Sequence, residues 1–142
     1  MNAYSLKPMS SLQYYNDAGA GEERNRLYHY SQAVVVGDTV KLAGQGGWTP
    51  ENALDANDGD GQVELAFRNV ERVLETVGLG WDDVYSVRTY HTSLPLSMAK
   101  TVETLAKHTP NHKPILTGIG VSHLADPRML IEVEVEAYAG KK

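Results

Sequence analysis

Cysteine is absent from this chain of 142 residues, phenylalanine occurs once, and no long apolar run is present. Without cysteine the chain can form no disulfide, thiolate metal site or cysteine nucleophile. No apolar run approaches the roughly 20 residues of a membrane-spanning helix. Residues 1–8 also lack the apolar segment of a secretory signal. We therefore expect a cytoplasmic protein with no membrane partner.

Positive charge is also scarce. The 18 acidic residues outnumber the 13 lysines and arginines, and the formal net charge at pH 7 is −5. Binding to a nucleic-acid backbone needs a basic surface, and the lysines and arginines form no evident cluster in the sequence. This balance argues against a nucleic-acid partner.

The length and the 42% apolar content fit one domain with its own core. Residues 1–25 are polar and rich in turn formers, and they predict an N-terminal segment made of an edge strand over residues 11–15 and a loop. The remaining residues, 26–142, form the predicted domain.

A hairpin is predicted around Gly37 and Asp38. These two turn formers separate the β-branched run Val34–Val36 from a second run, Thr39–Ala43. Further strands are predicted over residues 84–91, 115–121 and 129–138.

Two helices are predicted from apolar residues at helical spacing. The first has Asp58 or Asp60 as its N-cap, ends near Gly78, and carries a stripe of Val63, Ala66, Phe67, Val70, Val73, Leu74 and Val77. The second has Ser93 as its N-cap, Pro95 in its first turn, and a stripe of Met98, Val102 and Leu105.

The predicted order is β-β-β-α-β-α-β-β, in which both helices cross over one face of a sheet and leave the other face uncovered. On the last strand, apolar residues alternate with Glu132, Glu134 and Glu136. Two interpretations of these glutamates remain open: a solvated face, or a cleft or interface between subunits. Arg88 on another strand can relieve the repulsion between stacked carboxylates.

Three motifs resemble ligand sites but lack a required residue. Gly44–Gly47 follows a strand without the lysine and helix start of a phosphate loop. The acidic run Asp55–Gly61 fails as a calcium loop because its twelfth position is Ala66. His108 and His112 have zinc-ligand spacing, but a proline and an asparagine lie between them. We expect no metal site.

One set of residues suggests chemistry when taken together. Tyr30 precedes the hairpin, the glycines of Gly118–Val121 can expose backbone groups, and Glu132 or Glu134 supplies a carboxylate. A carboxylate and a carbonyl can hold and activate a water molecule for hydrolysis of a C=N bond.

The chain resembles the Rid family, also called YjgF, over about residues 30–139. The segments that carry this resemblance are Tyr30-Ser31-Gln32-Ala33, Gly44-Gln45, Asn69-Val70, Asp82-Asp83-Val84 and Leu124-Ala125-Asp126-Pro127 to Met129-Leu130-Ile131-Glu132. The resemblance implies a chorismate-mutase-like α+β domain, with a six-stranded mixed sheet and two helices on one face. It also implies a homotrimer with a central β-barrel and small-molecule clefts between subunits, which favours an interface role for the uncovered face.

Family deaminases hydrolyse reactive imines and enamines such as 2-aminoacrylate, and they need no cofactor. By resemblance, the catalytic positions are Glu132, Tyr30 and the Gly118 backbone. The implied ligand-binding positions are Ala43, Gly44, Gln45, Leu116, Thr117, Glu134 and Arg88.

Three departures from the family pattern remove polarity from this site. Leu116 stands where the deaminases have the arginine that forks onto the substrate carboxylate, Ala43 stands where they have serine, and Gly118 where they have cysteine. Losing a charge-assisted pair costs about 2–3 kcal/mol. Arg88 or Arg128 can replace the arginine only from another position.

These observations predict a divergent Rid-family protein that acts on a small imine, enamine or related intermediate, and that is not an efficient 2-aminoacrylate deaminase. The alternative is a non-catalytic trimeric protein that binds a small molecule or has a regulatory role. Nuclease or translation-inhibitor activity, a label attached to some relatives, is disfavoured by the acidic balance.

Overall fold

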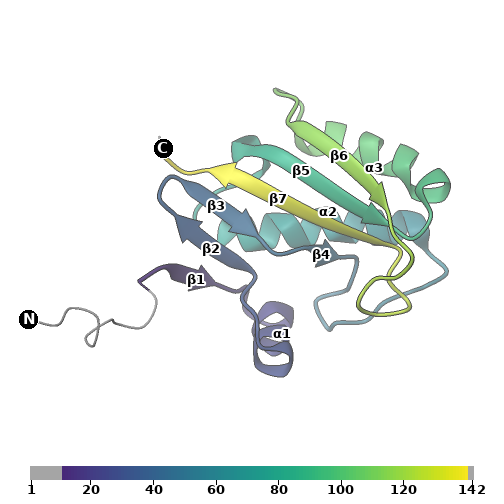
Figure 1. Cartoon of the computed structure of the whole chain (residues 1–142), viewed down its shortest axis with the longest axis horizontal. Helices are drawn as coiled ribbons and strands as arrows, with labels where there is room; N and C mark the ends of the chain where they lie inside the picture. Colours follow the sequence, from purple (N-terminus) through teal and green to yellow (C-terminus); the bar gives the residue numbers. More distant parts are fainter. Residues whose placement is uncertain (1–10, 141–142) are drawn as a thin grey trace, which may run out of the picture.

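Seven strands form one mixed sheet in residues 11–140, the part of the chain that the computed structural model describes (Figure 1). They are β1 (Gln13–Tyr15), β2 (Ala33–Val36), β3 (Thr39–Leu42), β4 (Gln45–Gly46), β5 (Val84–His91), β6 (Ile115–Gly120) and β7 (Ile131–Tyr138). The strand order is β1-β2-β3-β7-β5-β6, and β4 also pairs with β7. Strands β5 and β6 are parallel, and the other pairs are antiparallel. The α+β class is confirmed, with one more strand than predicted because the two-residue β4 joins β7.

The predicted hairpin is present as β2 and β3. Its turn uses Gly37 at φ 60°, a left-handed conformation that costs glycine little. The register pairs Ala33 with Leu42 and Val35 with Val40. These four side chains therefore share one face of the sheet, and they pack into the core.

The first predicted helix is α2 (Gly59–Glu75), which covers the middle of the sheet. The Asp58 side chain accepts a hydrogen bond from the Gly61 amide at 2.9 Å, as an N-cap should. Gly78, with φ 75°, lies just beyond the helix. The predicted stripe is buried from Val63 to Leu74, whereas Val77 lies beyond the end of the helix and is partly buried. Phe67 stacks on Trp81 of the 3₁₀ turn Trp81–Asp83 with ring centroids 4.9 Å apart.

The second predicted helix is α3 (Leu94–His108), and its predicted apolar stripe is partly wrong. Val102 is 50% exposed, whereas Thr101 and Thr104 are buried beside Leu105. Each threonine hydroxyl donates to the carbonyl four residues earlier, at 2.8 and 2.7 Å. Because these hydroxyls are satisfied within the helix, the threonines can face the core.

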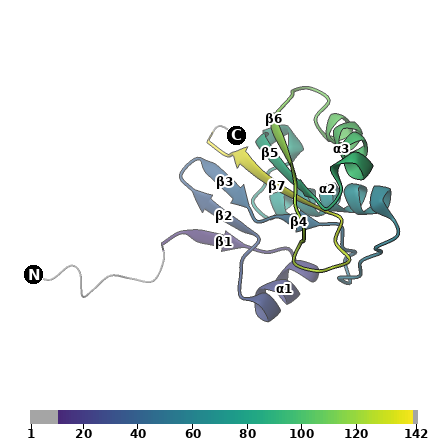
Figure 2. The same cartoon turned by 45° about the vertical axis from the view of Figure 1, so that its right-hand side comes forward.

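A third helix, α1 (Ala20–Tyr28), corrects the expectation of a loop in the N-terminal segment. The edge strand is present as β1, but the helix begins five residues after it and crosses the predicted boundary at residue 25. Figures 1 and 2 show α1 below β2 and β4, away from α2 and α3. None of the helices in residues 11–140 is long and apolar enough to cross a membrane.

The sheet has a covered face and an open face. Ile131, Val133 and Val135 of β7 are buried against the helices, and the glutamates between them point the other way. On the open face, Tyr90 donates to Glu134 at 2.5 Å and Tyr85 donates to Glu136 at 2.9 Å. Phenol donors from β5 therefore bind these two carboxylates.

Candidate functional site

The Glu132 side chain lies directly over the backbone of Gly44. A Cβ atom at Gly44 would come within 2.5 Å of the Glu132 carboxylate carbon, so glycine is required for this approach. Gly44 follows β3 and Glu132 is the second residue of β7. Gly46 and Gly47 also allow close packing, against Trp48 and the Gln62 backbone. The glycine run therefore allows close approach of side chains and backbone at the end of β3.

Burial raises the pKa of the Glu132 carboxyl above its ordinary value. The charge of Glu134 adds to the rise, and the charge of Arg24 opposes it. A carboxyl group of this kind retains a proton more readily than an exposed glutamate and is a stronger base when ionised, which suits it to general acid–base chemistry.

Tyr30 is placed by the end of α1. His29 caps the helix in the left-handed conformation, with φ 58° and ψ 49°, and so turns the chain toward β2. Asn25 of the same helix donates to the Tyr30 carbonyl at 2.9 Å. Burial raises the pKa of the Tyr30 phenol, while Arg24 opposes that rise through its charge and a side-chain hydrogen bond. Tyr30 therefore remains a neutral phenol that can donate a hydrogen bond to a ligand.

Two buried glutamines connect this corner to the sheet. Gln32 donates to Gln45 at 3.2 Å, and Gln45 donates to the carbonyl of Ala43 at 3.0 Å. Gln32 also accepts from the backbone amide of Asp17 at 2.8 Å. The side chain of Gln45 is thus engaged in holding the loop after β3.

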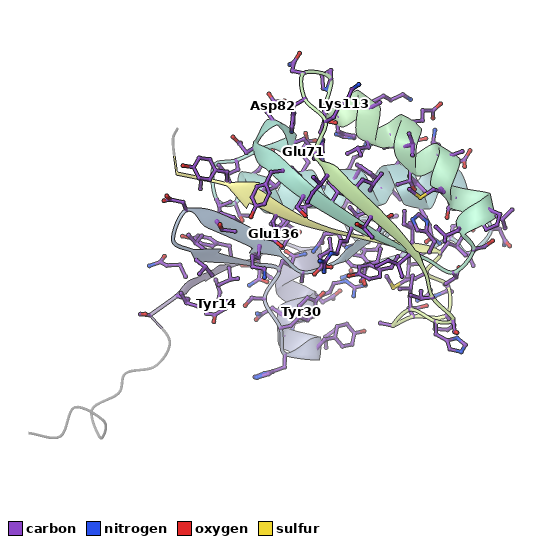
Figure 3. All side chains as sticks on the ribbon, turned by 45° about the horizontal axis from the view of Figure 1, so that its top comes forward. Tyr14, Tyr30, Glu71, Asp82, Lys113 and Glu136 are labelled. Carbon is purple, nitrogen blue, oxygen red and sulfur yellow. The ribbon has the colours of Figure 1, made fainter. Side chains whose placement is uncertain are left out.

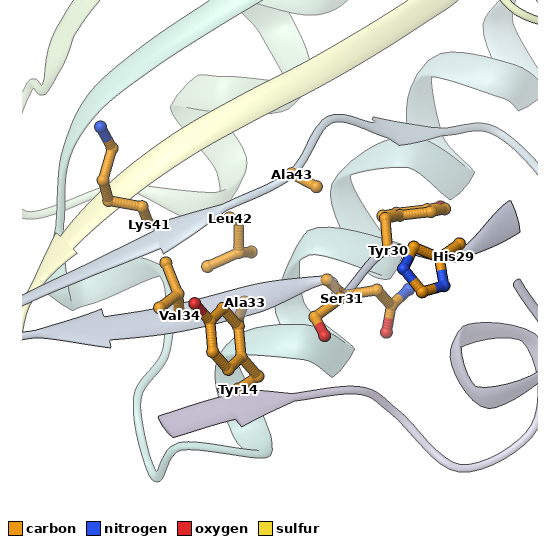
Figure 4. Close-up of a pocket in the computed structure, with 10 residues that line it drawn as sticks. Tyr14, His29, Tyr30, Ser31, Ala33, Val34, Lys41, Leu42 and Ala43 are labelled. Carbon is orange, nitrogen blue, oxygen red and sulfur yellow. The ribbon is translucent and has the colours of Figure 1, made fainter. Parts of the chain in front are cut away.

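A hollow of about 580 Å³ lies on the outer side of β2 and β3 (Figure 4). Tyr30 and Ala43 lie at one end of it, and Tyr14, Val34 and Lys41 at the other. Figure 3 shows Tyr14 and Tyr30 on the opposite side of the molecule from Asp82 and Lys113.

Leu116 and Gly118 lie on the helix-covered face of β6, unlike Glu132. The register pairs Leu116 with Val87 and Gly118 with Thr89, both buried residues of β5. Leu116 borders a largely apolar groove of about 480 Å³ formed with the end of α3 and residues 109–114. A Cβ atom at Gly118 would meet the Met98 sulfur at 2.9 Å.

The structure therefore divides the predicted site residues of one protomer into three groups. Tyr30, Ala43, Gly44, Gln45 and Glu132 gather where α1 meets the sheet. The pair Leu116 and Gly118 borders α3. The remaining residues, Thr117, Glu134 and Arg88, belong to the open face, where Arg88 is in register with both of the others. Arg128 is exposed and forked onto Asp126 at 3.0 and 2.8 Å, which holds the pKa of Asp126 at about 2.

Two further residues near Tyr30, Arg24 and Trp48, were not predicted from the sequence. Arg24 of α1 stacks on Trp48, with its guanidinium carbon 3.6 Å from the ring centroid. Trp48 is buried with Ala20 and Met129. The only signal in the sequence was the charged run Glu22-Glu23-Arg24 shortly before Tyr30, and it did not indicate which way the arginine points.

Metal binding has no support in the described part of the chain, where no three histidine, aspartate or glutamate side chains group to hold an ion. His112 instead bonds the Val84 carbonyl at 2.7 Å, and His108 stacks on Phe67 at 5.6 Å.

Comparison with known proteins assigns the family. A family model described as Endoribonuclease L-PSP matches residues 22–139. A RutC family protein of Pyrococcus abyssi is 33% identical over 110 residues, covering 77% of this chain and 85% of its own length. The RutC family protein YjgH of Escherichia coli is 32% identical over 107 residues, covering 72% and 80%.

A solved structure supports the same assignment. A member of the YjgF/YER057c/UK114 family from Mycobacterium tuberculosis superposes with a TM-score of 0.75 at 27% identity, covering 90% of this chain and 99% of its own. The chain therefore belongs to the Endoribonuclease L-PSP family, which is the YjgF/Rid family.

Proposed function

We propose that this protein hydrolyses a small imine or enamine in a cleft that two subunits of a homotrimer complete. The observation that carries the proposal is the half-buried Glu132 carboxyl, held over Gly44 beside Tyr30, with a raised pKa. A base with these properties can accept a proton from water and return it within one reaction.

The proposed reaction balances without a cofactor. Glu132 removes a proton from water as the oxygen attacks the C=N carbon, and Glu132 then gives this proton to the nitrogen, which restores the carboxylate. The resulting carbinolamine then expels ammonia, with its hydroxyl proton passing to Glu132 and on to the departing nitrogen. An imine and one water molecule give a carbonyl compound and ammonia. Tyr30 donates a hydrogen bond to the substrate, and the Gly118 backbone of a neighbouring subunit helps hold the water.

The need for a second subunit follows from the two faces of the sheet. Within one protomer, the sheet separates Glu132 from the side of Gly118 that faces Met98. An exposed row of Tyr14, Val36, Tyr85, Ile115 and Tyr138 on the uncovered side of the molecule offers apolar area for association.

A complementation experiment tests the shared cleft. The variant Glu132→Gln removes the base, and the variant Gly118→Val blocks the half of the cleft that Gly118 supplies. A homotrimer of either variant alone should therefore release ammonia from freshly generated imines only slowly. If equal amounts of the two variants mix at random, about a quarter of all clefts combine two intact halves and regain activity. The double variant in one chain is the control, because mixing it with Glu132→Gln leaves no cleft with an intact base. A monomer in light scattering, or no recovery on mixing, would refute the shared cleft.

A second function, binding without catalysis, is favoured by the apolar groove beside Leu116. In that case wild type and Glu132→Gln would release ammonia at the same background rate. Native mass spectrometry would then show a retained ligand. The family description also names an endoribonuclease. The net charge of −5 disfavours RNA as a substrate.

A further inference from the structure

His91 lies at the centre of a buried chain of hydrogen bonds between β5 and α3. Its Nδ1 atom is 2.6 Å from the hydroxyl oxygen of Ser97, and its Nε2 atom is 2.7 Å from the hydroxyl oxygen of Thr89. His91 and Thr89 are fully buried, and Ser97 is buried as well. Ser97 also donates to the carbonyl of Ser93, the N-cap residue of α3, at 3.1 Å. The chain of bonds therefore runs from the start of α3 to the side chains of β5.

The partners at both ends give this chain one direction. The single proton of the Ser97 hydroxyl goes to the Ser93 carbonyl, so Ser97 accepts from the Nδ1–H group of His91. Burial lowers the pKa of His91, and a neutral imidazole with its proton on Nδ1 leaves Nε2 as an acceptor. Thr89 then donates to Nε2, the one acceptor that its hydroxyl has among residues 11–140. Because Ser97 is an acceptor in this arrangement, His91 does not activate it as a nucleophile.

The far end of the chain lies against the backbone of Gly118. Thr89 and Gly118 are partners in the parallel register of β5 and β6, and a Cβ atom at Gly118 would lie 3.4 Å from the Thr89 hydroxyl oxygen. The Met98 sulfur, 2.9 Å from the same point, closes the α3 side. The carbonyl of His91 also accepts from the amide of Val121, just beyond β6, at 2.8 Å. Within residues 11–140, β6 pairs with β5 alone, so contacts from β5 and α3 determine where the Gly118 backbone lies.

A buried imidazole is a costly way to fill the space between a strand and a helix. Burying its polar atoms lowers stability unless each one is hydrogen-bonded, and an apolar side chain of similar size carries no such cost. What the hydrogen-bonded chain adds is a single arrangement, because the ring of His91 and the hydroxyls of Thr89 and Ser97 fix one another's orientation. The chain therefore serves to fix geometry more than to add stability.

We propose that His91 is a positioning residue for the proposed reaction, and that through Thr89 it holds the Gly118 backbone where that backbone helps to bind the attacking water. This inference rests on the proposed function, in which Gly118 of one subunit faces Glu132 of its neighbour. His91 is fully buried and acts only through Thr89 and β6. Breaking the chain should therefore loosen the Gly118 backbone without removing any group that contacts the substrate.

Removing the Thr89 hydroxyl tests this inference by NMR spectroscopy of the whole protein. Thr89→Val keeps the shape of the side chain but leaves His91 Nε2 without a donor, so the Gly118 amide signal should broaden through conformational exchange. Thr89→Ser keeps the hydroxyl and should keep the sharp signal of wild type. Thr104→Val is the matched control, because it removes another buried threonine hydroxyl, one that bonds the Lys100 carbonyl within α3. Nitrogen-15 shifts should place the His91 proton on Nδ1. A proton on Nε2, or an unchanged Gly118 signal in Thr89→Val, overturns the inference.

Kinetics connect the chain to the reaction, with ammonia release from the imine that an L-amino-acid oxidase forms from leucine as the assay. Thr89→Val and His91→Gln should each lower kcat on the order of tenfold and change KM little, because a displaced water slows the chemical step. The double variant should lose no more than either single variant, since both changes break one chain. Additive losses, or an equal loss of kcat in Thr104→Val, would overturn the positioning role.

Failure of the proposed function would look different. In that case no protein, wild type included, would release ammonia above background. The exchange broadening of the Gly118 signal would still decide whether His91 holds this backbone in place.

Discussion

Replacing Gly44 with alanine should separate catalysis from folding. The added Cβ would lie 2.5 Å from the carboxylate carbon of Glu132 and 2.6 Å from its Cγ, whereas ordinary contacts begin at 3.4 Å. The carboxylate must therefore retreat by about 1 Å. Because the obstructing atoms belong to a flexible side chain rather than to the backbone, Glu132 can swing aside at little cost to folding.

The expected loss of activity follows from that displacement. A misplacement of about 1 Å can cost about a hundredfold in rate, or roughly 2.7 kcal/mol in the activation free energy. We expect kcat/KM for imine hydrolysis to fall by this order in Gly44→Ala, with a melting temperature close to that of wild type. Ammonia release measures the first quantity, and circular dichroism the second.

Two other glycines provide matched controls. A Cβ at Gly47 would meet the backbone of Gln62 at 2.3 Å, so Gly47→Ala should destabilise the fold by about 1–3 kcal/mol. A Cβ at Gly59 would meet only Leu130, at an ordinary 3.7 Å, so Gly59→Ala should change neither quantity by much. Full activity in a folded Gly44→Ala protein would refute the reasoning, because it would show that the position of Glu132 over Gly44 does not matter.

The remaining predictions concern pH and the core. Burial raises the pKa of Glu132, so ionisation of this carboxyl lowers the stability of the fold as pH rises through that pKa. The variant Glu132→Gln should therefore have a higher melting temperature than wild type at pH 8. The control Glu136→Gln, on the open face of the sheet, should not. The same shift should move the acid limb of the kcat/KM profile above pH 4.5, and a limb at or below that value would exclude Glu132 as the base. Burial lowers the pKa of His91, which forms hydrogen bonds with Ser97 and Thr89, so the stability of wild type should fall as pH drops below 6.5. The melting temperature of His91→Gln should depend less on pH between 7 and 5. If the variant keeps the pH dependence of wild type, another group is responsible for it. Phe67→Ala should cost about 3–5 kcal/mol in chemical denaturation, because Phe67 is fully buried; a loss below 1 kcal/mol would contradict the stacking with Trp81 and His108.

Local signals explain which elements could be predicted from the sequence. Helix α2 combines a side-chain cap, a buried stripe and a glycine end, and all three are local. Helix α1 has only nine residues, a glycine at its N-cap position and no side-chain cap bond, so its local signals are limited to an acidic first turn and Arg26 in the last turn. It forms because Gly21 packs against Gln32, where a Cβ would come within 2.1 Å of the amide oxygen. That contact is tertiary.

The same distinction applies to the site. Glu132 and Tyr30 could be named as candidates from the sequence because Glu132 lies in a recognisable strand and Tyr30 lies just before one. Arg24 could not, since its partners Trp48 and Asn52 lie more than 20 residues away and meet it only when α1 docks. The phenol donors to the open-face glutamates likewise depend on the register of β5 and β7, which includes an irregularity between Val84 and Ser86.

The position of Leu116 changes what its substitution means. An arginine lost from the α3 side of β6 does not strip the Glu132 side of its cation, because Arg24 already lies there. On the proposed function, the substrate lies between Glu132 of one subunit and the apolar groove that Leu116 borders in the neighbouring subunit. On this proposal, we expect substrates with a bulky apolar chain to be favoured over 2-aminoacrylate, since a groove of about 480 Å³ exceeds what such a small molecule fills.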